Sequence, residues 1–240
     1  LFLSGDIDEL GANEENRAVM MDYQGDGLWK YTMELPASAK KFHYEYLVKS
    51  GEGIRREWGS PHSFSPGRNA GEYRLVDRWR DVPADLPFYS SAFIQGIFFR
   101  QHADSVVDTI EPGTLTVKVD ASQLRPDERL VMVGDCPELG DWDVLKAPLL
   151  NDSAFPEWQI TLDGRQLKFP FEYKFVIVRT HQREVVAWET GENRICREKP
   201  QNPSEAVVVS GLRFNGFESR WKGAGTAIPV FSLRSEAGFG

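Results

Sequence analysis

Apolar and polar side chains alternate along much of this chain. In TLTVKVD, residues 114–120, the apolar Leu115, Val117 and Val119 alternate with polar residues, which is the pattern of a strand with one buried face. Further strands are predicted at 42–48, 130–133, 158–162, 171–178, 184–188 and 206–210. No stretch of three helical turns is amphipathic, so the pattern predicts an all-β chain.

One stretch of the chain occurs twice. SGDIDELG at 4–11 returns as VGDCPELG at 133–140, and adding 129 to a residue number also pairs Trp29 with Trp158. A repeat of this length indicates two copies of one small domain. Since each copy holds several short strands, we expect two antiparallel β-sandwiches in tandem.

The repeat divides the chain into four parts. We expect a first module at 1–80, which lacks its first strand, and a second module at 114–220. Segment 81–113 joins them; its three prolines predict an extended connector, and the apolar FIQGIFF at 93–99 predicts that it packs between the modules. Segment 221–240 does not fit the repeat, although it contains a strand-like run.

Composition limits the partners. The formal net charge of -8 argues against binding to nucleic acid or to an anionic membrane surface, and no apolar run reaches the ~18 residues of a membrane span. We therefore expect a neutral or cationic partner. The two cysteines, Cys136 and Cys196, fit a reducing compartment at least as well as a disulfide, so we expect a cytoplasmic location. The chain opens without a start Met, which leaves an upstream signal peptide open.

No catalytic residue, metal ligand or cofactor site is predicted within these 240 residues. The GxSxG, GxxxxGK[ST] and GxGxxG motifs are missing, and a catalytic carboxylate pair cannot be recognised among 36 acidic residues. The four histidines are scattered without the spacing of metal ligands, and we expect them at the surface or half-buried.

Differences between the copies point to a binding site in the second module. Trp142 follows ELGD in a turn, where the first copy has Asn13, and a core position rarely accepts both residues. Lys174 lies on the outward face of its strand, where the first copy has Glu45. Exposed indoles, here Trp142 and Trp188, stack on the apolar face of a sugar, and polar side chains bond its hydroxyls. The alternative from these residues alone is a plain β-sandwich with surface aromatics.

The second module resembles a known family. VGDCPELGDWDVLKAPLL, PEWQITL, FEYKFVIV and VAWETGENR, within 133–194, are similar in order and spacing to the starch-binding domain, carbohydrate-binding module family 20. The resemblance implies an immunoglobulin-like β-sandwich that binds α-1,4-glucan such as starch, glycogen or maltodextrin. It also assigns the residues of the principal site: the stacking rings Trp142 and Trp188, the lysine Lys174, and the polar residues Glu189 and Asn193.

The family's second site uses two tyrosines, which the second module lacks. It has Pro126 and Asp152 at those positions, with Phe155 as a weak substitute. The first module keeps Trp58 of the principal site but has lost the other site residues. It has Tyr23 six residues before Trp29, in the place of a second-site tyrosine, so it is expected to bind weakly or to serve as a spacer.

The tail suggests a larger parent protein. IPVFSLRSEAGFG, residues 228–240, resembles the entry into the catalytic (β/α)8 barrel of the 4-α-glucanotransferases of glycoside hydrolase family 77, so 221–240 is expected to begin that barrel. The resemblance implies a parent enzyme that transfers α-1,4-glucan segments by a retaining double displacement, with its catalytic carboxylates beyond Gly240. Two alternatives stay open: a non-enzymatic glycogen- or starch-binding protein, and a pair of sandwiches that only scaffold an enzyme.

Overall fold

In the part of the chain that the structure describes, the regular structure consists of β-strands and short 3-10 turns, as the alternation predicted. The computed structural model describes residues 1–36, 38–67, 69, 71–81, 110–216 and 227–235. Strands of the first module are β1 (Phe2–Gly5), β2 (Val19–Met20), β3 (Asp22–Gly25), β4 (Leu28–Leu35), β5 (Phe42–Ser50), β6 (Gly53–Arg56), β7 (His62–Phe64) and β8 (Glu72–Val76). Strands of the second are β9 (Thr114–Asp120), β10 (Glu128–Gly134), β11 (Asn151–Ala154), β12 (Glu157–Asp163), β13 (Phe171–Arg179), β14 (Val185–Trp188), β15 (Arg194–Cys196) and β16 (Glu205–Arg213), followed by β17 (Ile228–Ser235). Short 3-10 turns, η1 (Asp8–Leu10), η2 (Glu15–Arg17) and η4 (Pro137–Leu139), complete the described elements.

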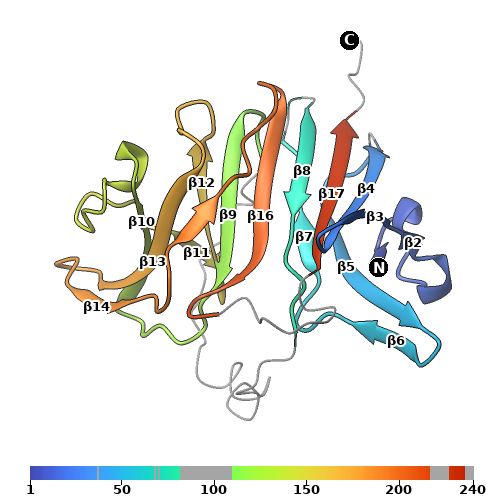
Figure 1. Ribbon diagram of the computed structural model, residues 1–240, viewed down its shortest axis with the longest axis horizontal. Coiled ribbons are helices and arrows are strands. Elements are labelled where there is room, and N and C mark those ends of the chain that lie inside the picture. Colours follow the sequence, from blue (N-terminus) through green and yellow to red (C-terminus); the bar gives the residue numbers. More distant parts are fainter. Residues whose placement is uncertain (37, 68, 70, 82–109, 217–226, 236–240) are drawn as a thin grey trace.

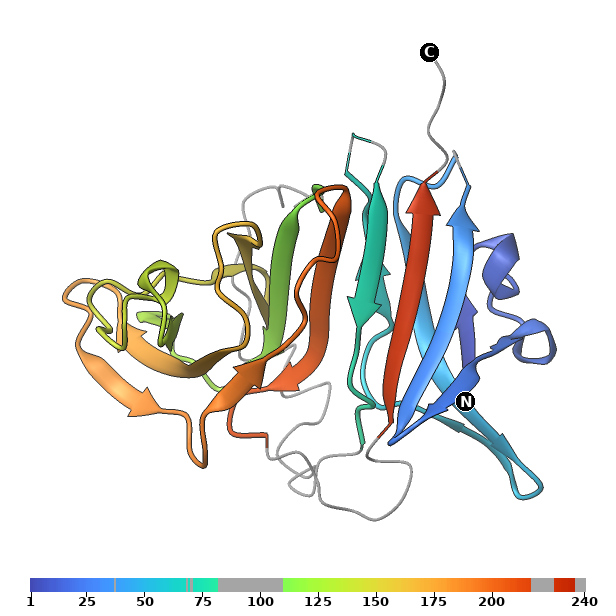
Figure 2. The ribbon, with the colours of Figure 1, turned by 45° about the horizontal axis from the view of Figure 1, so that its top comes forward.

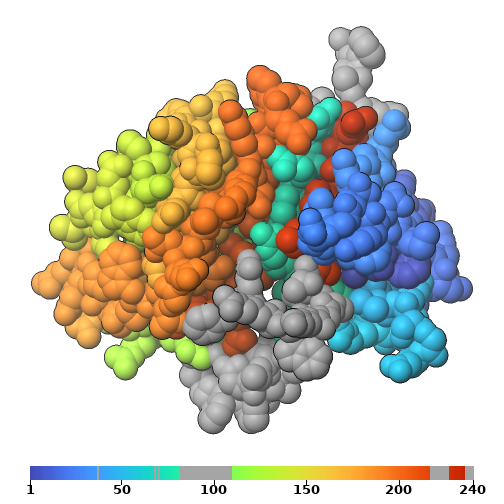
Figure 3. All heavy atoms as spheres, viewed as in Figure 1, coloured from blue at the N-terminus to red at the C-terminus, as the bar shows by residue number. Residues whose placement is uncertain are grey.

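The two modules share one sheet. Its eight strands run in the order β11-β12-β9-β16-β8-β17-β4-β3, a continuous row across the molecule (Figure 1). The modules join where β16 pairs with β8 in parallel, with Val208 opposite Leu75. Figure 3 shows the atoms of the second module directly against those of β8. Parallel pairs therefore accompany the expected antiparallel ones, and the tandem sandwiches form one body.

Smaller sheets complete each sandwich at the two ends of the long sheet (Figures 1 and 2). The sheet of β10, β13, β14 and β15 covers the second module, and the sheet of β1, β2, β5, β6 and β7 covers the first. Alternate residues of β16 enter different cores: Val207 and Val209 pack in the second module, Ala206 and Val208 in the first. The two small sheets thus cover opposite faces of the shared one, which explains why β16 is apolar on both sides.

The repeated motif is conserved between the copies for a steric reason. A Cβ on Gly134 would lie 2.5 Å from the carbonyl oxygen of Glu172, and a Cβ on Gly5 would lie 2.7 Å from that of His43. The last glycine of the motif has a positive φ in both copies, 86° at Gly11 and 81° at Gly140. Neither place accepts a side chain without strain.

The tail does not form a separate unit in the part of it that the structure describes. We expected 221–240 to begin a barrel, but Ile228–Ser235 forms β17, between β4 and β8 of the first module. Phe231 and Leu233 of β17 are fully buried in the first core. An alternating apolar strand suits either role, and here it covers two strand edges that would otherwise be unpaired. Residues 217–226 and 236–240 lie outside the described part.

β17 holds the place in the first module that β9 holds in the second. In the second module β9 lies between β12 and β16, antiparallel to β12 and parallel to β16. In the first module β17 lies between the corresponding β4 and β8, parallel to β4 and antiparallel to β8. The same slot is therefore filled in the reverse direction.

A buried polar network fastens the modules together. Asp77, directly after β8, has no exposed surface, and its Oδ2 accepts hydrogen bonds from the hydroxyls of Tyr44 and Tyr46 at 3.0 and 2.6 Å. Ser210 of β16 donates to Asp77 Oδ1. Because that donation uses the hydroxyl hydrogen, the Ser210 oxygen accepts from His62 Nδ1, 3.1 Å away. The network thus contains side chains from both modules.

His62 continues the network on its other side and is buried, whereas we expected the histidines to be at the surface or half-buried. Its Nε2 lies 2.9 Å from Oε1 of Glu57, and Arg80 Nε donates to Glu57 Oε2 at 3.1 Å. Burial opposes a charge on Glu57, but the adjacent His62 and Arg80 outweigh it, so the pKa of the Glu57 carboxyl lies below its ordinary value.

Several smaller expectations can be compared with the described residues. The connector 81–113, including FIQGIFF, lies mostly outside them; its last part is ordered, with Ile110 buried in the first core. Cys136 and Cys196 are both buried and free. Within the described ranges, the chain contains no helix long and apolar enough to cross a membrane.

Candidate functional site

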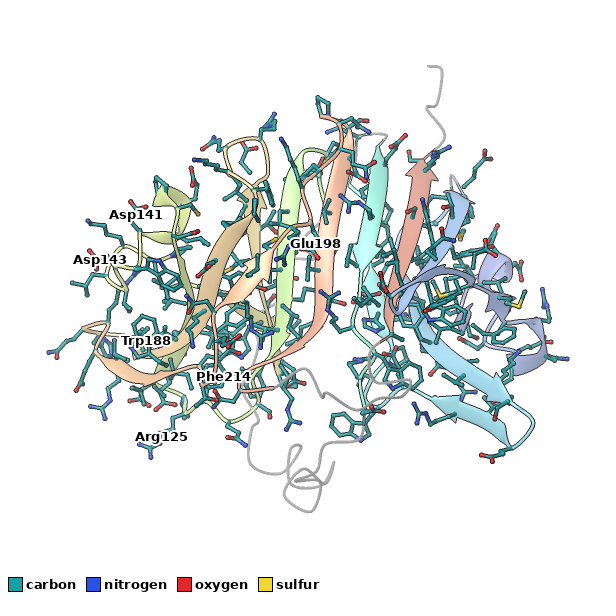
Figure 4. The ribbon with its side chains drawn as sticks, in the orientation of Figure 1. Arg125, Asp141, Asp143, Trp188, Glu198 and Phe214 are labelled. Atoms are coloured by element: carbon teal, nitrogen blue, oxygen red, sulfur yellow. The ribbon has the colours of Figure 1, made fainter. Side chains whose placement is uncertain are left out.

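Trp188 is one of the two aromatic rings that the sequence assigned to the principal site. It ends β14, opposite Val176 of β13, and 43% of its surface is exposed. An indole exposed to this extent on a strand is available to a flat ligand. Figure 4 shows it at the end of the molecule away from the first module, near the turn marked by Asp141 and Asp143.

Trp142 lies in that turn and is half-buried. Its backbone N–H donates to the carbonyl of Gly134 at 2.7 Å, and its ring packs on a small apolar cluster that includes Val144 and Val176. The backbone of Trp142 is left-handed, with φ of 65°. A bulky residue in this conformation is strained by about 1 to 2 kcal/mol, and such strain concentrates at functional positions.

Lys174 and Asn193 bring polar groups to the same end of the second module. Lys174 Nζ donates to the carbonyl oxygens of Glu189 and Gly191, at 3.1 and 2.5 Å, so it also holds the segment that follows β14. Asn193 is exposed, and its Nδ2 donates to Glu172 Oε2 at 2.8 Å. Both keep further hydrogen-bonding capacity for sugar hydroxyls.

The structure corrects the role expected for Glu189. Its side chain is buried, and its Oε1 and Oε2 accept from Arg194 Nη2 and Nε at 2.6 and 3.0 Å. The same carboxylate accepts from the backbone N–H groups of Phe175 and Asn215. A carboxylate this well bonded and this little exposed cannot reach a surface ligand. Glu189 therefore supports the segment after Trp188 and does not contact glucan through its side chain.

The corresponding surface of the first module carries paired charges. Asn13 stands at the position of Trp142 with nearly the same backbone, φ of 64°. Glu45, at the position of Lys174, is paired with Arg56, which also lies 2.5 Å from Glu15 of the neighbouring loop. Arg56 thus joins the loop and the strand in an ion-pair network where the second module has Trp142 and Lys174.

The three weaker candidates lie outside the site of Trp142 and Trp188. Tyr23 is 59% exposed on the edge strand β3, with its ring centroid 4.9 Å from that of Trp29, which makes an open aromatic surface. Trp58 is half-buried, and its backbone bonds the carbonyl of Arg80. Phe155 leans on the core Trp158 at 6.3 Å between centroids and is half-buried.

Sequence reasoning missed two arginines at the principal site. Arg194 neutralises Glu189, as described above. Arg183, in the turn between β13 and β14, donates to two backbone carbonyls of the loop that carries Trp142. The copies do differ at this place, since the β5–β6 turn at 51–52 is shorter than the turn that carries Arg183, but the contact joins segments 36 and 38 residues apart. Within the described residues no group of three or more His, Cys, Asp or Glu is placed to hold a metal ion.

A family model and a curated relative each match a large part of this chain. A family model described as "Starch binding domain" matches residues 1–69 and 114–207. The 4-alpha-glucanotransferase DPE2 of Oryza sativa subsp. japonica is 30% identical over 209 residues, which are 81% of this chain and 21% of that protein. The chain thus spans about a fifth of the length of that relative.

The solved structures that match this chain are more distant in sequence. The family 20 CBM of the maltotetraose-forming amylase from Pseudomonas saccharophila STB07 is 19% identical, covering 39% of this chain and 98% of that one, with a TM-score of 0.33. The family 15 glucoamylase from Hypocrea jecorina is 18% identical, covering 44% of this chain and 18% of that one, with a TM-score of 0.36.

Proposed function

Because the chain belongs to the starch-binding domain family, we propose that its second module binds α-1,4-glucan, as in starch, glycogen or maltodextrin, through Trp142 and Trp188. The observation that carries this proposal is the strained, half-buried Trp142 in the same end of the module as the exposed Trp188. Two indoles stack on successive sugar faces, and Lys174 and Asn193 bond the hydroxyls at the rim.

The test is calorimetric titration with a cyclodextrin. Trp142→Ala and Trp188→Ala should each lower the affinity by about 5- to 150-fold, since removing an aromatic contact in a binding site costs about 1 to 3 kcal/mol. Ile195→Ala is the matched control, because Ile195 has the same 43% exposure on β15 of the same sheet. Equal affinities in all four proteins would rule out this site.

We also propose an enzymatic activity for the longer protein of which this region is a part. The likeness to a 4-alpha-glucanotransferase supports a parent enzyme of that class, in which this region is not catalytic and holds glucan near a downstream barrel. Such tethering would raise the local concentration of substrate at the catalytic site. We propose a cytoplasmic location for the same protein, in keeping with its two free cysteines, and cell fractionation with an antibody tests it.

Reading the gene past Gly240 separates this proposal from its alternative. A downstream barrel of several hundred residues, together with transfer of glucan segments between malto-oligosaccharides, supports the enzyme. A stop codon, or a different domain, favours a non-enzymatic glycogen- or starch-binding or scaffold protein.

A further inference from the structure

The two aromatic rings of the site come from separate parts of the second module. Trp142 belongs to the loop that follows η4, and Trp188 ends the β13–β14 hairpin. For one glucan to contact both rings, the loop and the hairpin must keep a fixed relative position. Any contact between them therefore bears on binding, even where it does not touch the ligand.

Arg183 makes such a contact. It lies in the hairpin turn, and its Nη1 donates to the carbonyl oxygen of Leu145 at 2.9 Å and to that of Ala147 at 2.7 Å. These are charge-assisted hydrogen bonds, which are stronger than those between neutral groups. One guanidinium nitrogen thus holds the loop at two points, three and five residues after Trp142.

Arg183 is itself held in an unusual conformation. Its φ is 51°, in the left-handed region that an arginine seldom adopts, and its backbone N–H donates to Arg179 O at 2.9 Å. The side chain is half-buried. The turn therefore directs the guanidinium at the loop instead of leaving it in solvent.

The rest of the loop is attached to β10 by backbone hydrogen bonds, such as that from Met132 N–H to the carbonyl of Pro148 at 3.2 Å, and to the sheet by apolar packing. Val144 and Ala147 are buried against Val131 and Val178 of the sheet below, in the cluster on which Trp142 packs. Asp143 supports the turn locally, since its Oδ1 accepts from the backbone N–H of Leu145 at 3.0 Å. Apolar packing sets the height of the loop above the sheet, and the bonds from Arg183 set its position along the hairpin.

The first module supports the connection between this contact and binding. It has Asn13 in place of Trp142, and its β5–β6 hairpin turns at 51–52, whereas the β13–β14 hairpin turns over 180–184. The shorter turn has no position that corresponds to Arg183. The copy without the stacking ring therefore also lacks the arginine.

We propose that Arg183 is a positioning residue for glucan binding, which fixes the Trp142 loop against the β13–β14 hairpin so that both indoles face one ligand. The inference rests on the proposed function of this site. Arg183 does not contact the glucan in this proposal, and its effect passes through Trp142.

A double-mutant cycle with cyclodextrin titration tests the inference. Arg183→Ala should lower the affinity about tenfold in the wild-type background and leave it unchanged in the Trp142→Ala background, because there is then no ring to position. Arg183→Lys keeps a cationic donor and should recover part of the loss. The matched control is Arg179→Ala, from the same hairpin, whose guanidinium bonds Glu184 Oε2 at 3.0 Å; it should bind as the wild type does.

Amide hydrogen exchange gives a second readout without ligand. Arg183→Ala should raise exchange at Lys146 and Ala147 while leaving the strands of the core protected. Wild-type affinity in Arg183→Ala would overturn the inference, and so would an equal loss in the Trp142→Ala background. Failure of the proposed site is distinguishable, since Trp142→Ala and Trp188→Ala would then bind like the wild type. If Arg183→Ala does not fold, the same cycle with Arg183→Lys decides, and full additivity there overturns the inference.

Discussion

Trp142 and Asn13 occupy the same turn of the two modules with almost the same φ, 65° and 64°. Asparagine is one of the few residues that adopt this left-handed conformation readily, whereas a tryptophan in it costs about 1 to 2 kcal/mol. The second module therefore carries a local strain that its own repeat shows to be avoidable. This difference at a single position separates the structural requirement of the turn from the requirement for binding.

Asp120 is a second residue in an unfavourable environment, because burial opposes the negative charge of its carboxylate. Burial at the end of β9 raises the pKa of this carboxyl from 3.8 to about 6, although the charge of Arg213 acts in the opposite direction. The neutral carboxyl therefore favours the folded state below about pH 3.8, and this contribution is lost as the pH rises through about 6. At neutral pH the ionised group destabilises the fold.

We accordingly expect Asp120→Asn to raise the free energy of unfolding at pH 7.5 by on the order of 2 kcal/mol and to change it little at pH 4. Urea denaturation at both pH values measures the difference. The control is Asp163→Asn, since the exposed Asp163 is bonded to Arg165 and its removal should bring no gain. An equal gain at both pH values for Asp120→Asn would contradict the explanation.

At the scale of elements, β17 shows that a pattern which predicts a strand does not predict the strands with which it pairs. Its alternating pattern defines a strand, but β17 pairs with β4 and β8, which lie about 200 and 155 residues earlier in the chain. The edges of β4 and β8 select it because an unpaired edge leaves backbone groups without partners. Its buried side chains then close the first core.

Phe231→Ala should therefore destabilise the first module. The ring is fully buried and contacts Tyr31, Phe42 and Tyr44, and truncation of such a residue costs about 3 to 5 kcal/mol. Arg234→Ala, at an exposed position of the same strand, should change stability by less than about 1 kcal/mol. Denaturant unfolding measures both variants. Similar small effects of the two would mean that β17 does not belong to this sheet.

At the scale of the whole molecule, the shared sheet makes the two modules one mechanical unit. The sheet passes through the junction of β16 and β8, and each module contributes side chains to the core of the other. Trp188, of the proposed glucan site, lies at the end of the second module away from the first (Figure 4). Because the sheet is continuous, we expect the first module to keep a fixed orientation relative to that proposed site.

Loss of the Ser210 hydroxyl should weaken this union. In Ser210→Ala, Asp77 loses a donor and His62 loses an acceptor in a region with almost no exposure, which costs about 1 to 3 kcal/mol. Because the sheet is continuous, we expect a single thermal transition in both the wild type and the variant, with equal calorimetric and van't Hoff enthalpies. Ser50→Ala, at an exposed position of β5, serves as the control and should melt like the wild type. Two separate transitions in the wild type would show that the modules are independent.

The sequence alone determined the strands and the duplication, because each depends on neighbours a few positions apart or on comparison of one copy with the other. Alternation located β9, β12 and β13, and the contrast between Trp142 and Asn13 is the basis of the proposed site. The glycines of the repeat were also readable as a shared requirement, although their close contacts were not.

Only the tertiary structure decided which strands become partners and which polar groups are buried. The insertion of β17 beside β4, the ion pair that removes Glu189 from the surface and the contact of Arg183 with the loop all join segments that local patterns cannot relate. A strand's alternation defines its faces, but its edges are filled by whatever segment the packing of the whole chain brings to them. For the same reason, the sequence alone does not show whether a charged residue binds a ligand or pairs with a buried counter-ion.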